Sequence, residues 1–442
     1  MSTFNNGFIQ SGDGNISEPF VLGRAGQSVQ VGGYFAPPIE PRNICILGDS
    51  TAVRNSTIVP GSYIAYENNG PMAWASCFLG WCWDWEPSDN FAVSGYTTAN
   101  VIDKELPLML AAHATRRYER AFISVGTNDT YGGATIAQVK SNLMTLFNTL
   151  RSVGIIPVHL GIKPRGADAT MIGYKQNNMA INEWLYSLSI TGLIEYIDNN
   201  EAYADNSTAF GNSLTSLMPD NLHQNNAGAQ LEGKLIADYY KAKGYVPNIK
   251  YATSQADKFD RANNPNGILF NNANPLLQGG TTAPTNMITQ GGTWSKVSRT
   301  LPNGQTRSDP TVAILLNSTL HQLYAFRVAS ANWLSTDPQP GEIIQSRSKI
   351  VVVGGANISS NQLSITENNG SGNFLSYCLR MGTSPVPLLV GDYTLYLKTP
   401  KIAIRDYAGS GVCSIYSNQE LSTLTSATGA FTIQAHEPRI IN

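Results

Sequence analysis

From about residue 43 to residue 245 the chain alternates short apolar runs with longer segments of helical period, and this alternation constrains the fold more than any other feature. Such a pattern is typical of a parallel sheet that is covered by helices on both faces. The sequence therefore predicts a three-layer α/β/α domain over residues 43–246, in which ligands bind at the carboxyl ends of the strands. The expected strands are Ile44–Leu47, Ala121–Val125, Ile155–Leu160 and Ile194–Ile197.

Three segments have the spacing of amphipathic helices, two of them between these strands and one after the last strand. In Ile136–Val153 the apolar residues recur every three or four positions, and Met179–Leu193 and Ala227–Lys243 are similar. Gly154 and Gly244 follow the first and the last of these segments, where a glycine commonly ends a helix. We therefore expect each of these three segments to form a helix.

The composition changes after Tyr245. Residues 247–264 are expected to form a linker, and residues 265–442 lose the helical period and carry short runs of strand composition between turn residues. This pattern predicts a second domain, an antiparallel β-sandwich or jelly roll that binds carbohydrate or drives oligomerisation. The clearest of its strand-like runs are Val312–Leu316, Gln322–Val328, Ile350–Val353, Tyr393–Leu397 and Ala430–Ile433.

The charge balance and the length of the apolar runs exclude several classes of partner. The chain has 29 basic and 31 acidic residues, without the basic stripe that a phosphate backbone requires, so we expect no nucleic-acid partner. No apolar run approaches the ~20 residues that cross a bilayer, so we expect no membrane insertion. Residues 1–42 contain no recognisable signal peptide and are expected to form an extended arm. Synthesis in the cytoplasm follows from this expectation.

Five cysteines are too few for a disulfide scaffold in 442 residues, and no Cys-x-x-Cys pair suggests zinc. We expect free thiols, and no metal or cofactor.

The first chemical motif is Gly48-Asp49-Ser50, which follows the expected strand Ile44–Leu47 directly. A serine at this place can act as a nucleophile if a base lies within hydrogen-bond reach and a third group orients that base. Of the five histidines, only His223 has an aspartate three residues before it, Asp220, so both side chains can share one turn. The motif alone is more often a helix cap, and its catalytic interpretation depends on the other motifs.

An acyl-transfer site also needs hydrogen-bond donors for the oxyanion that forms during the reaction. Three candidates are the backbone N–H of Ser50, the backbone N–H of Gly95 and the side-chain amide of Asn128. Asp49 and Asp129 are expected to brace their loops. The other histidines, His113, His159, His321 and His436, are expected to be packing or surface residues.

Four blocks occur in order along the chain: Gly48-Asp49-Ser50-Thr51, Ser94-Gly95-Tyr96-Thr97-Thr98, Gly126-Thr127-Asn128-Asp129 and Asp220-Asn221-Leu222-His223. Together they resemble the signature blocks of the SGNH (GDSL-type) hydrolase family, over roughly residues 43–245. The resemblance implies a flavodoxin-like fold, a Ser50-His223-Asp220 triad, and an oxyanion hole formed by Ser50, Gly95 and Asn128. The Gly-x-Ser-x-Gly elbow of the larger α/β hydrolases is absent.

The stretch from Ser56 to Asp89 departs from the family pattern. Part of it, around residues 63–67, is expected to be an insertion near the pocket mouth. Trp81, Trp83 and Trp85 alternate within it, and we expect them to be packing aromatics; a stacking platform for sugar rings is the alternative. Tyr131 and Tyr96 are the candidate substrate-binding residues because they adjoin the Asn128 and Gly95 blocks.

Family members act on acyl lipids, thioesters and acetylated polysaccharides. A β-domain rich in Asn, Thr, Gly and Tyr favours an O-acetylated polysaccharide, so the expected activity is that of an acetylesterase. The alternatives are a lipase or thioesterase that acts on other acyl esters, and a glycan-binding or structural protein with an inactive hydrolase scaffold. The glycine-rich arm and the β-domain also resemble parts of a bacteriophage tail spike or fibre, which implies a virion protein and a homo-oligomer, a trimer in that setting.

Overall fold

The computed structural model divides the chain into two compact units, Met1–Pro41 and Arg42–Asn442. It describes all residues except 1–2, 6–7, 11–15, 19, 25–26, 32–41, 167–171, 209–210, 270–273, 282–283, 286–287, 291–292, 314–319, 331, 334, 383–385 and 442.

The first unit contains short antiparallel strands in the region where we expect an extended arm. Three of them form one sheet in sequence order, and the other two pair as a hairpin. The strands are β1 (Thr3–Asn5), β2 (Phe8–Gln10), β3 (Ile16–Glu18), β4 (Phe20–Arg24) and β5 (Gln27–Val31).

The second unit begins with a five-stranded parallel sheet in the order β12-β11-β10-β6-β9. Four of the strands are those predicted from apolar runs, each within two residues of its expected bounds, and β9 is an addition at the edge. The strands are β6 (Arg42–Gly48), β9 (Trp83–Asp84), β10 (Arg120–Ser124), β11 (Ile156–Leu160) and β12 (Glu195–Ile197).

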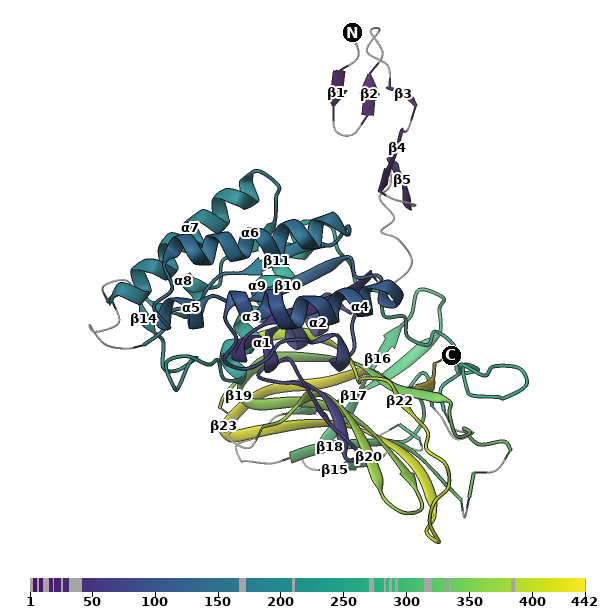
Figure 1. The fold of residues 1–442 in the computed structure, drawn as a ribbon. Coiled ribbons are helices and arrows are strands. Elements are labelled where there is room, and N and C mark those ends of the chain that lie inside the picture. The colour runs from purple at the N-terminus through teal and green to yellow at the C-terminus, as the bar shows by residue number, and fades with distance from the viewer. Residues whose placement is uncertain are drawn as a thin grey trace. The chain divides into compact units, whose positions relative to one another are not determined.

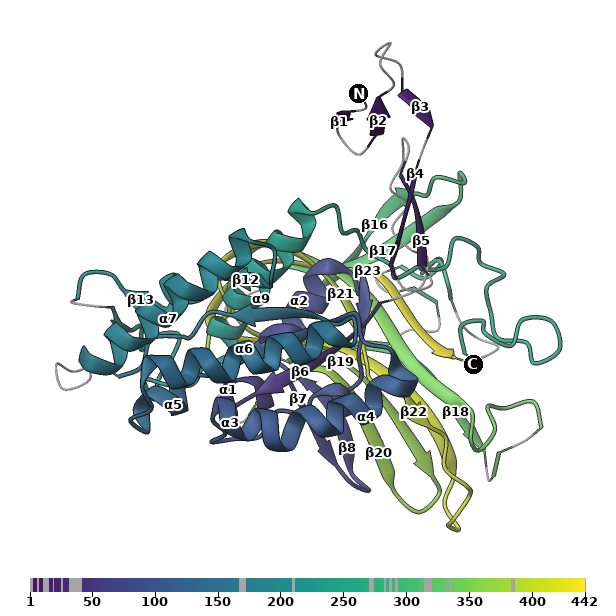
Figure 2. The ribbon, with the colours of Figure 1, turned by 45° about the horizontal axis from the view of Figure 1, so that its top comes forward.

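Helices cover both faces of this sheet, as Figures 1 and 2 show. Side chains alternate along a strand, so Cys45 and Leu47 of β6 pack on one face and Ile44 and Ile46 on the other. The first face carries α4 (Leu106–Arg116), α6 (Ile136–Ser152) and α7 (Ile172–Ile190), and the second carries α2 (Pro71–Leu79) and α9 (Asn226–Ala242). The predicted three-layer α/β/α arrangement is confirmed.

Short elements fill the connections. They are α1 (Ser50–Val53), η1 (Pro87–Asp89), α3 (Thr98–Asn100), η2 (Val101–Glu105), α5 (Thr127–Tyr131), α8 (Asn200–Tyr203), β13 (Ala204–Asp205) and β14 (Asn212–Ser213).

The rest of the second unit is a large sheet that is built around two long antiparallel strands, β19 and β23. The two strands pair along most of their length. Register shifts between Lys349 and Ser360 interrupt the regular pairing near the middle of β19. The antiparallel character agrees with the sequence, while the jelly-roll topology stays a prediction. The strands are β15 (Ile288–Gln290), β16 (Trp294–Thr300), β17 (Thr306–Ala313), β18 (Leu320–Ser330), β19 (Ile343–Asn369), β20 (Asn373–Arg380), β21 (Gly391–Lys398), β22 (Ile402–Ala403) and β23 (Cys413–Ile440).

The segment that departs from the family pattern joins this large sheet. A hairpin of β7 (Ser56–Val59) and β8 (Tyr63–Glu67) lies at its edge, where β8 pairs in parallel with β20. The two strands are about 310 residues apart in sequence. The α/β part and the β-rich part therefore share a sheet.

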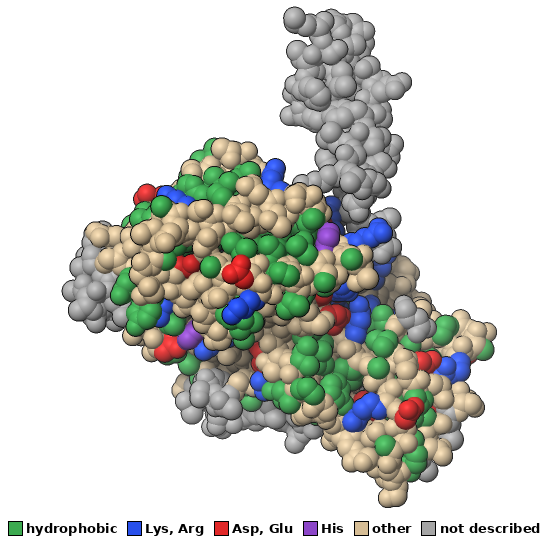
Figure 3. Space-filling model, viewed as in Figure 1, with side chains coloured by type: hydrophobic (Ala, Val, Ile, Leu, Met, Phe, Trp, Pro, Cys, Tyr) green, Lys and Arg blue, Asp and Glu red, His purple; other side chains and the backbone are tan. Residues whose placement is uncertain are grey.

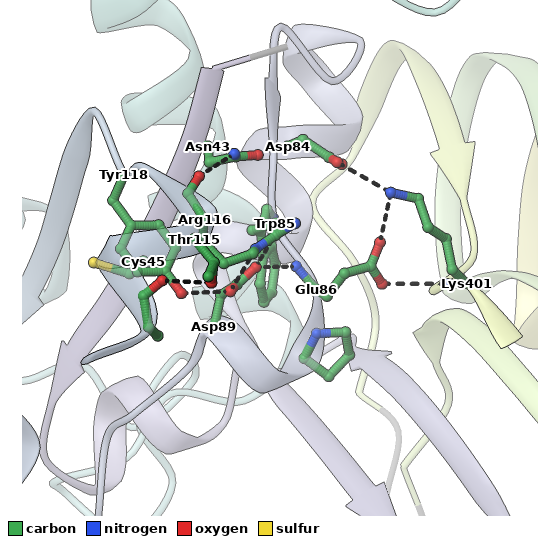
Figure 4. Close-up of polar contacts among 12 residues, drawn as sticks. Asn43, Cys45, Asp84, Trp85, Glu86, Asp89, Thr115, Arg116, Tyr118 and Lys401 are labelled. Atoms are coloured by element: carbon green, nitrogen blue, oxygen red, sulfur yellow. Dashed lines mark hydrogen bonds and ion pairs between the residues drawn. The ribbon is translucent and has the colours of Figure 1, made fainter. Parts of the chain in front are cut away.

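Buried contacts reinforce this junction. Trp81, Trp83 and Trp85 are at most 2% exposed, so they are packing aromatics, as expected. The Asp84 carboxylate forms ion pairs with Lys398 at 2.5 Å and with Lys401 at 3.3 Å, and Figure 4 shows Lys401 between Asp84 and Glu86. Burial alone would raise the pKa of Asp84, but the two lysines hold it well below its ordinary value.

The surface carries charges of both signs. Figure 3 shows acidic and basic side chains scattered over the face in view, without one large patch of a single sign. In the part of the chain that the structure describes, no helix is both long and apolar enough to span a membrane.

Candidate active site

The nucleophile candidate lies on a tight turn between β6 and α1. Gly48 has a φ of +143°, and a Cβ added to it would lie 2.0 Å from the Ser124 carbonyl oxygen on the neighbouring strand β10. The Asp49 carboxylate then caps α1 by accepting from the Thr51 backbone N–H at 2.9 Å. Only glycine fits where the strand ends, and this close packing fixes Ser50 at the carboxyl edge of the sheet.

Ser50, His223 and Asp220 form one hydrogen-bonded row. Ser50 Oγ lies 2.7 Å from His223 Nε2, and His223 Nδ1 lies 2.7 Å from Asp220 Oδ2. The segments that carry them are 173 residues apart in sequence, and the turn before α9 returns the histidine to the edge of the sheet. His223 thus lies within hydrogen-bond distance of both Ser50 and Asp220.

The turn of Asp220 orients its carboxylate. Its Oδ1 accepts from the backbone N–H groups of Leu222 at 3.0 Å and of His223 at 2.7 Å, which leaves Oδ2 for the ring. Partial burial would raise the pKa of Asp220, but these hydrogen bonds and the ring lower it below its ordinary value. The carboxylate therefore stays ionised. Its side chain is 53% exposed and that of His223 is 21% exposed, so the charge is partly screened by water.

The Gly95 and Asn128 blocks meet beside this row. The Asn128 side-chain Nδ2 donates to the Tyr96 carbonyl oxygen at 3.0 Å, which joins α5 to the turn that contains Gly95. Gly95 has a φ of +81° and no atom within 4 Å of an added Cβ, so its backbone is open to solvent. Among the described residues, the N–H groups of Ser50 and Gly95 donate to no acceptor. The second hydrogen of Asn128 Nδ2 adds a third donor.

Asp129 braces the same region. Its carboxylate accepts from the Thr98 backbone N–H at 2.9 Å and from the Thr98 hydroxyl, so it holds the start of α3. Burial raises the pKa of Asp129, and burial raises that of Asp49 as well. Asp49 thus braces its own turn, whereas Asp129 joins α5 to the start of α3.

Glu105 is a buried carboxyl group that the sequence analysis did not single out. Its Oε2 accepts from the Gly48 backbone N–H at 2.8 Å and its Oε1 from the Val93 N–H at 3.1 Å, so it joins η2 to both loops of the site. Burial raises its pKa to about 8. No local pattern in the sequence identified it, because Glu105 follows two other charged residues, Asp103 and Lys104.

Arg165 is a second residue that the sequence did not indicate. Its Nη1 lies 3.4 Å from Asn128 Oδ1, and its guanidinium lies 3.8 Å from the centre of the Tyr131 ring. The contact orients the Asn128 amide so that its Nδ2 faces the Gly95 turn. Arg165 follows strand β11, and a charged residue after a strand could have marked it.

The two candidate substrate-binding tyrosines lie differently. The Tyr131 ring is 49% exposed and is stacked by Arg165, so one aromatic face adjoins the site. Tyr96 packs against the hydrophobic cluster on the face of the parallel sheet that carries Cys45 and Leu47. The ammonium of Lys104 lies 5.0 Å from the centre of its ring. The Tyr96 carbonyl oxygen contacts the site through Asn128.

Two of the remaining histidines lie away from this row. His159 is fully buried in β11, where burial lowers its pKa to about 4, and His113 Nδ1 accepts from the Tyr118 backbone N–H. Both are packing residues, as expected. His321 lies in β18 outside the described side chains. No group of three His, Cys, Asp or Glu side chains with the geometry of a metal site occurs in the described part of the chain.

Comparison with known proteins points to one family. Residues 46–231 match the model of the GDSL-like lipase/acylhydrolase family, a span that includes all four sequence blocks. No curated protein matches the chain.

Three solved structures illustrate the likeness. TesA is 17% identical with a TM-score of 0.35, and the match covers 46% of this chain and 99% of TesA. The psychrotrophic esterase EstA from a Pseudoalteromonas species is 18% identical with a TM-score of 0.31, over 46% and 98% of the two chains. The acetyl xylan esterase AlAXEase is 12% identical with a TM-score of 0.34, over 45% and 98%. The match of the family model is confined to residues 46–231, and over that region the chain is similar to the GDSL-like lipase/acylhydrolase family.

Proposed function

We propose that this protein is a serine esterase that removes O-acetyl groups from a polysaccharide. The observation that carries the proposal is the row from Ser50 Oγ through His223 to the Asp220 carboxylate, with both contacts at 2.7 Å. A hydroxyl, an imidazole and an ionised carboxylate in this order are what acyl transfer requires.

The reaction has two halves. His223 Nε2 takes the proton from Ser50 Oγ as the oxygen attacks the acetyl carbonyl carbon, and the oxyanion receives hydrogen bonds from the Ser50 N–H, the Gly95 N–H and Asn128 Nδ2. The imidazolium then protonates the departing sugar oxygen, which leaves acetyl-Ser50. A water molecule repeats the sequence, so that acetate is released and Ser50 regains its proton. Asp220 holds the proton on Nδ1 throughout.

A sugar substrate is supported by the surroundings of the row. The Tyr131 ring is exposed beside Asn128 and can stack on a sugar face, and the pocket beside His223 is lined mainly by polar side chains. A long acyl chain would need an extended apolar groove. The test below distinguishes this proposal from the two alternatives, a lipase or thioesterase and an inactive glycan-binding scaffold.

The test is acetate release from p-nitrophenyl acetate and from O-acetylated polysaccharides, with p-nitrophenyl palmitate as the long-chain comparison. We expect release by the intact protein, strongest on a polysaccharide, and a loss of at least 10³-fold in Ser50→Ala, about the effect of removing a serine nucleophile. Faster hydrolysis of the palmitate ester would favour the lipase alternative. Negligible release by both proteins on every substrate would favour the inactive scaffold.

A further inference from the structure

A pocket of about 620 Å³ lies beside the catalytic row, on the side of Asp220 and His223. Its walls come from both parts of the second unit: Arg54 and Asn69 from the α/β part, and Arg380 from the end of β20. In volume it is of the size that holds a small-molecule ligand, one or two sugar residues here. His223, which would protonate the departing sugar oxygen, lines this pocket.

Most of the charges in this pocket are already paired. Arg380 forms an ion pair with Glu67 at 2.9 Å across the β8–β20 contact, where the two residues are direct neighbours in register. The Asp220 carboxylate is hydrogen-bonded to His223. The Arg380–Glu67 pair leaves no net charge for a ligand, and the ionised Asp220 carboxylate is engaged by the His223 ring.

Arg54 is the exception. Its guanidinium makes one hydrogen bond, from Nη1 to the Gln224 carbonyl oxygen at 3.2 Å, and it has no ion-pair partner within 4 Å among the described residues. The side chain is half-buried, and burial lowers its pKa, an effect that the nearby Asp220 charge opposes. A guanidinium has five N–H donors in a planar fork, so most donors of this pocket-lining residue have no partner among the described residues.

Arg54 also lies close to the nucleophile. It is the C-cap of α1, four residues after Ser50, and residues four apart lie on the same face of a helix, about 6 Å apart along its axis. Arg54 lines the same pocket as His223 and Asp220, so a group bound to Arg54 would lie beside the catalytic row. Thr57 and the Asn69 amide, both half-buried at the same pocket, supply hydrogen-bonding groups for hydroxyls.

We propose that this pocket binds a carboxylate-bearing sugar, with the carboxylate on the Arg54 guanidinium, and that the enzyme therefore prefers O-acetylated acidic polysaccharides to neutral ones. The planar fork of arginine matches a carboxylate with two parallel hydrogen bonds, and partial burial strengthens such a pair relative to one in water. The inference rests on the proposed function, because it names the class of substrate for the same site.

The kinetic test compares an O-acetylated polyuronate with an O-acetylated neutral glycan of matched acetyl content. We expect the intact protein to favour the polyuronate, and Arg54→Gln to lower kcat/KM on it about tenfold, chiefly through KM, since a charge-assisted pair is lost. The neutral glycan should change less than about threefold. Arg54→Lys should recover part of the preference, because it restores the charge without the fork. Arg117→Gln, which removes an exposed arginine after α4, is the matched control.

Two outcomes would overturn the inference. One is an intact protein with no preference for the polyuronate, and the other is an Arg54→Gln variant that loses the same factor on both glycans, since Arg54 would then act through Asp220.

A binding measurement separates this inference from the proposed function. Titration of Ser50→Ala with deacetylated uronic-acid oligosaccharides needs no catalysis, and we expect affinity that Arg54→Gln removes. If every acetyl ester resists hydrolysis but this binding is present, the esterase proposal fails and the pocket assignment stands. If the oligosaccharides do not bind in either background, the pocket assignment fails by itself.

Discussion

At the scale of single residues, the exposure of Asp220 sets how much the triad carboxylate can contribute. Asp220 is 53% exposed, whereas the triad aspartate in the best-known serine proteases is buried. Water screens the attraction between the carboxylate and an imidazolium, so the electrostatic share of its effect is small. The larger share comes from the hydrogen bond that keeps the proton on His223 Nδ1.

Asp220→Asn tests this division. The asparagine Oδ1 can keep the bonds from the Leu222 and His223 N–H groups, so its Nδ2 would face His223 Nδ1 and force the proton onto Nε2. We expect kcat/KM on p-nitrophenyl acetate to fall by about 10²- to 10³-fold, less than the ~10⁴-fold seen where the aspartate is buried. Asp205→Asn is the matched control, because Asp205 also accepts from a residue two positions on. An Asp220→Asn variant as active as the intact protein would exclude the tautomer argument.

At the scale of elements, Glu105 joins three parts of the site. It lies at the end of η2 and holds both the end of β6 and the loop at Val93. Burial raises its pKa from 4.5 to about 8, the backbone N–H groups of Gly48 and Val93 lower it in part, and the Asp49 charge adds to the rise. The folded protein therefore keeps this proton to a higher pH than the unfolded chain.

The sign of the pH dependence follows from this difference. Between about pH 4.5 and pH 8 the folded state binds more protons at Glu105, so the free energy of unfolding falls as the pH rises. Glu105→Gln cannot titrate and should lack this component, which we expect to be about 2–4 kcal/mol over the window. Denaturant unfolding at pH 5, 7 and 9 measures it, with Glu183→Gln on the exposed face of α7 as control. Equal losses in the intact protein and Glu105→Gln would contradict the assignment.

The elements that the sequence predicted well are those with a local signal. Strand β6 was visible as an apolar run, and α6 as a stripe of buried residues at helical spacing. Helix α2 has no such stripe, because all of its residues from Pro71 to Leu79 are buried, and it was not predicted. Helix α7 begins at Ile172, seven residues before the predicted start, since its first turns carry few apolar residues.

The site was predictable where motifs carry it and not where distant contacts do. The order of the four blocks indicated Ser50, His223, Asp220 and Asn128 as neighbours. The pocket beside them depends on the parallel pairing of β8 with β20. The sequence of neither strand indicates that it pairs with the other, some 310 residues away. For the same reason Arg54 and Arg165 were invisible as site residues, because their importance comes from what the fold places around them.

At the scale of the whole molecule, the β-rich part packs against the α/β part and forms part of the candidate site. It contributes β20 to the wall of the pocket and buries Lys398 against Asp84. Residues 42–442 therefore form one compact unit, in which the catalytic row and the pocket are held by both parts.

The proposed setting of the chain in a phage tail spike is a statement about the whole assembly. It predicts a homotrimer with about three times the 47.7 kDa mass of one chain. Light scattering coupled to size-exclusion chromatography measures this mass at several protein concentrations. A monomer at every concentration would count against the tail-spike setting while leaving the esterase chemistry untouched.

The central claim is that Ser50 is a nucleophile activated by His223, and covalent labelling tests it most directly. The intact protein would be treated with a fluorophosphonate, and the modified peptide would be identified by mass spectrometry, with Ser50→Ala, His223→Ala and the control His113→Ala in parallel. We predict a single adduct on Ser50 that is absent from Ser50→Ala, at least 10²-fold slower in His223→Ala and unchanged in His113→Ala. Ester hydrolysis with no adduct on Ser50, or labelling that does not depend on His223, would contradict the account.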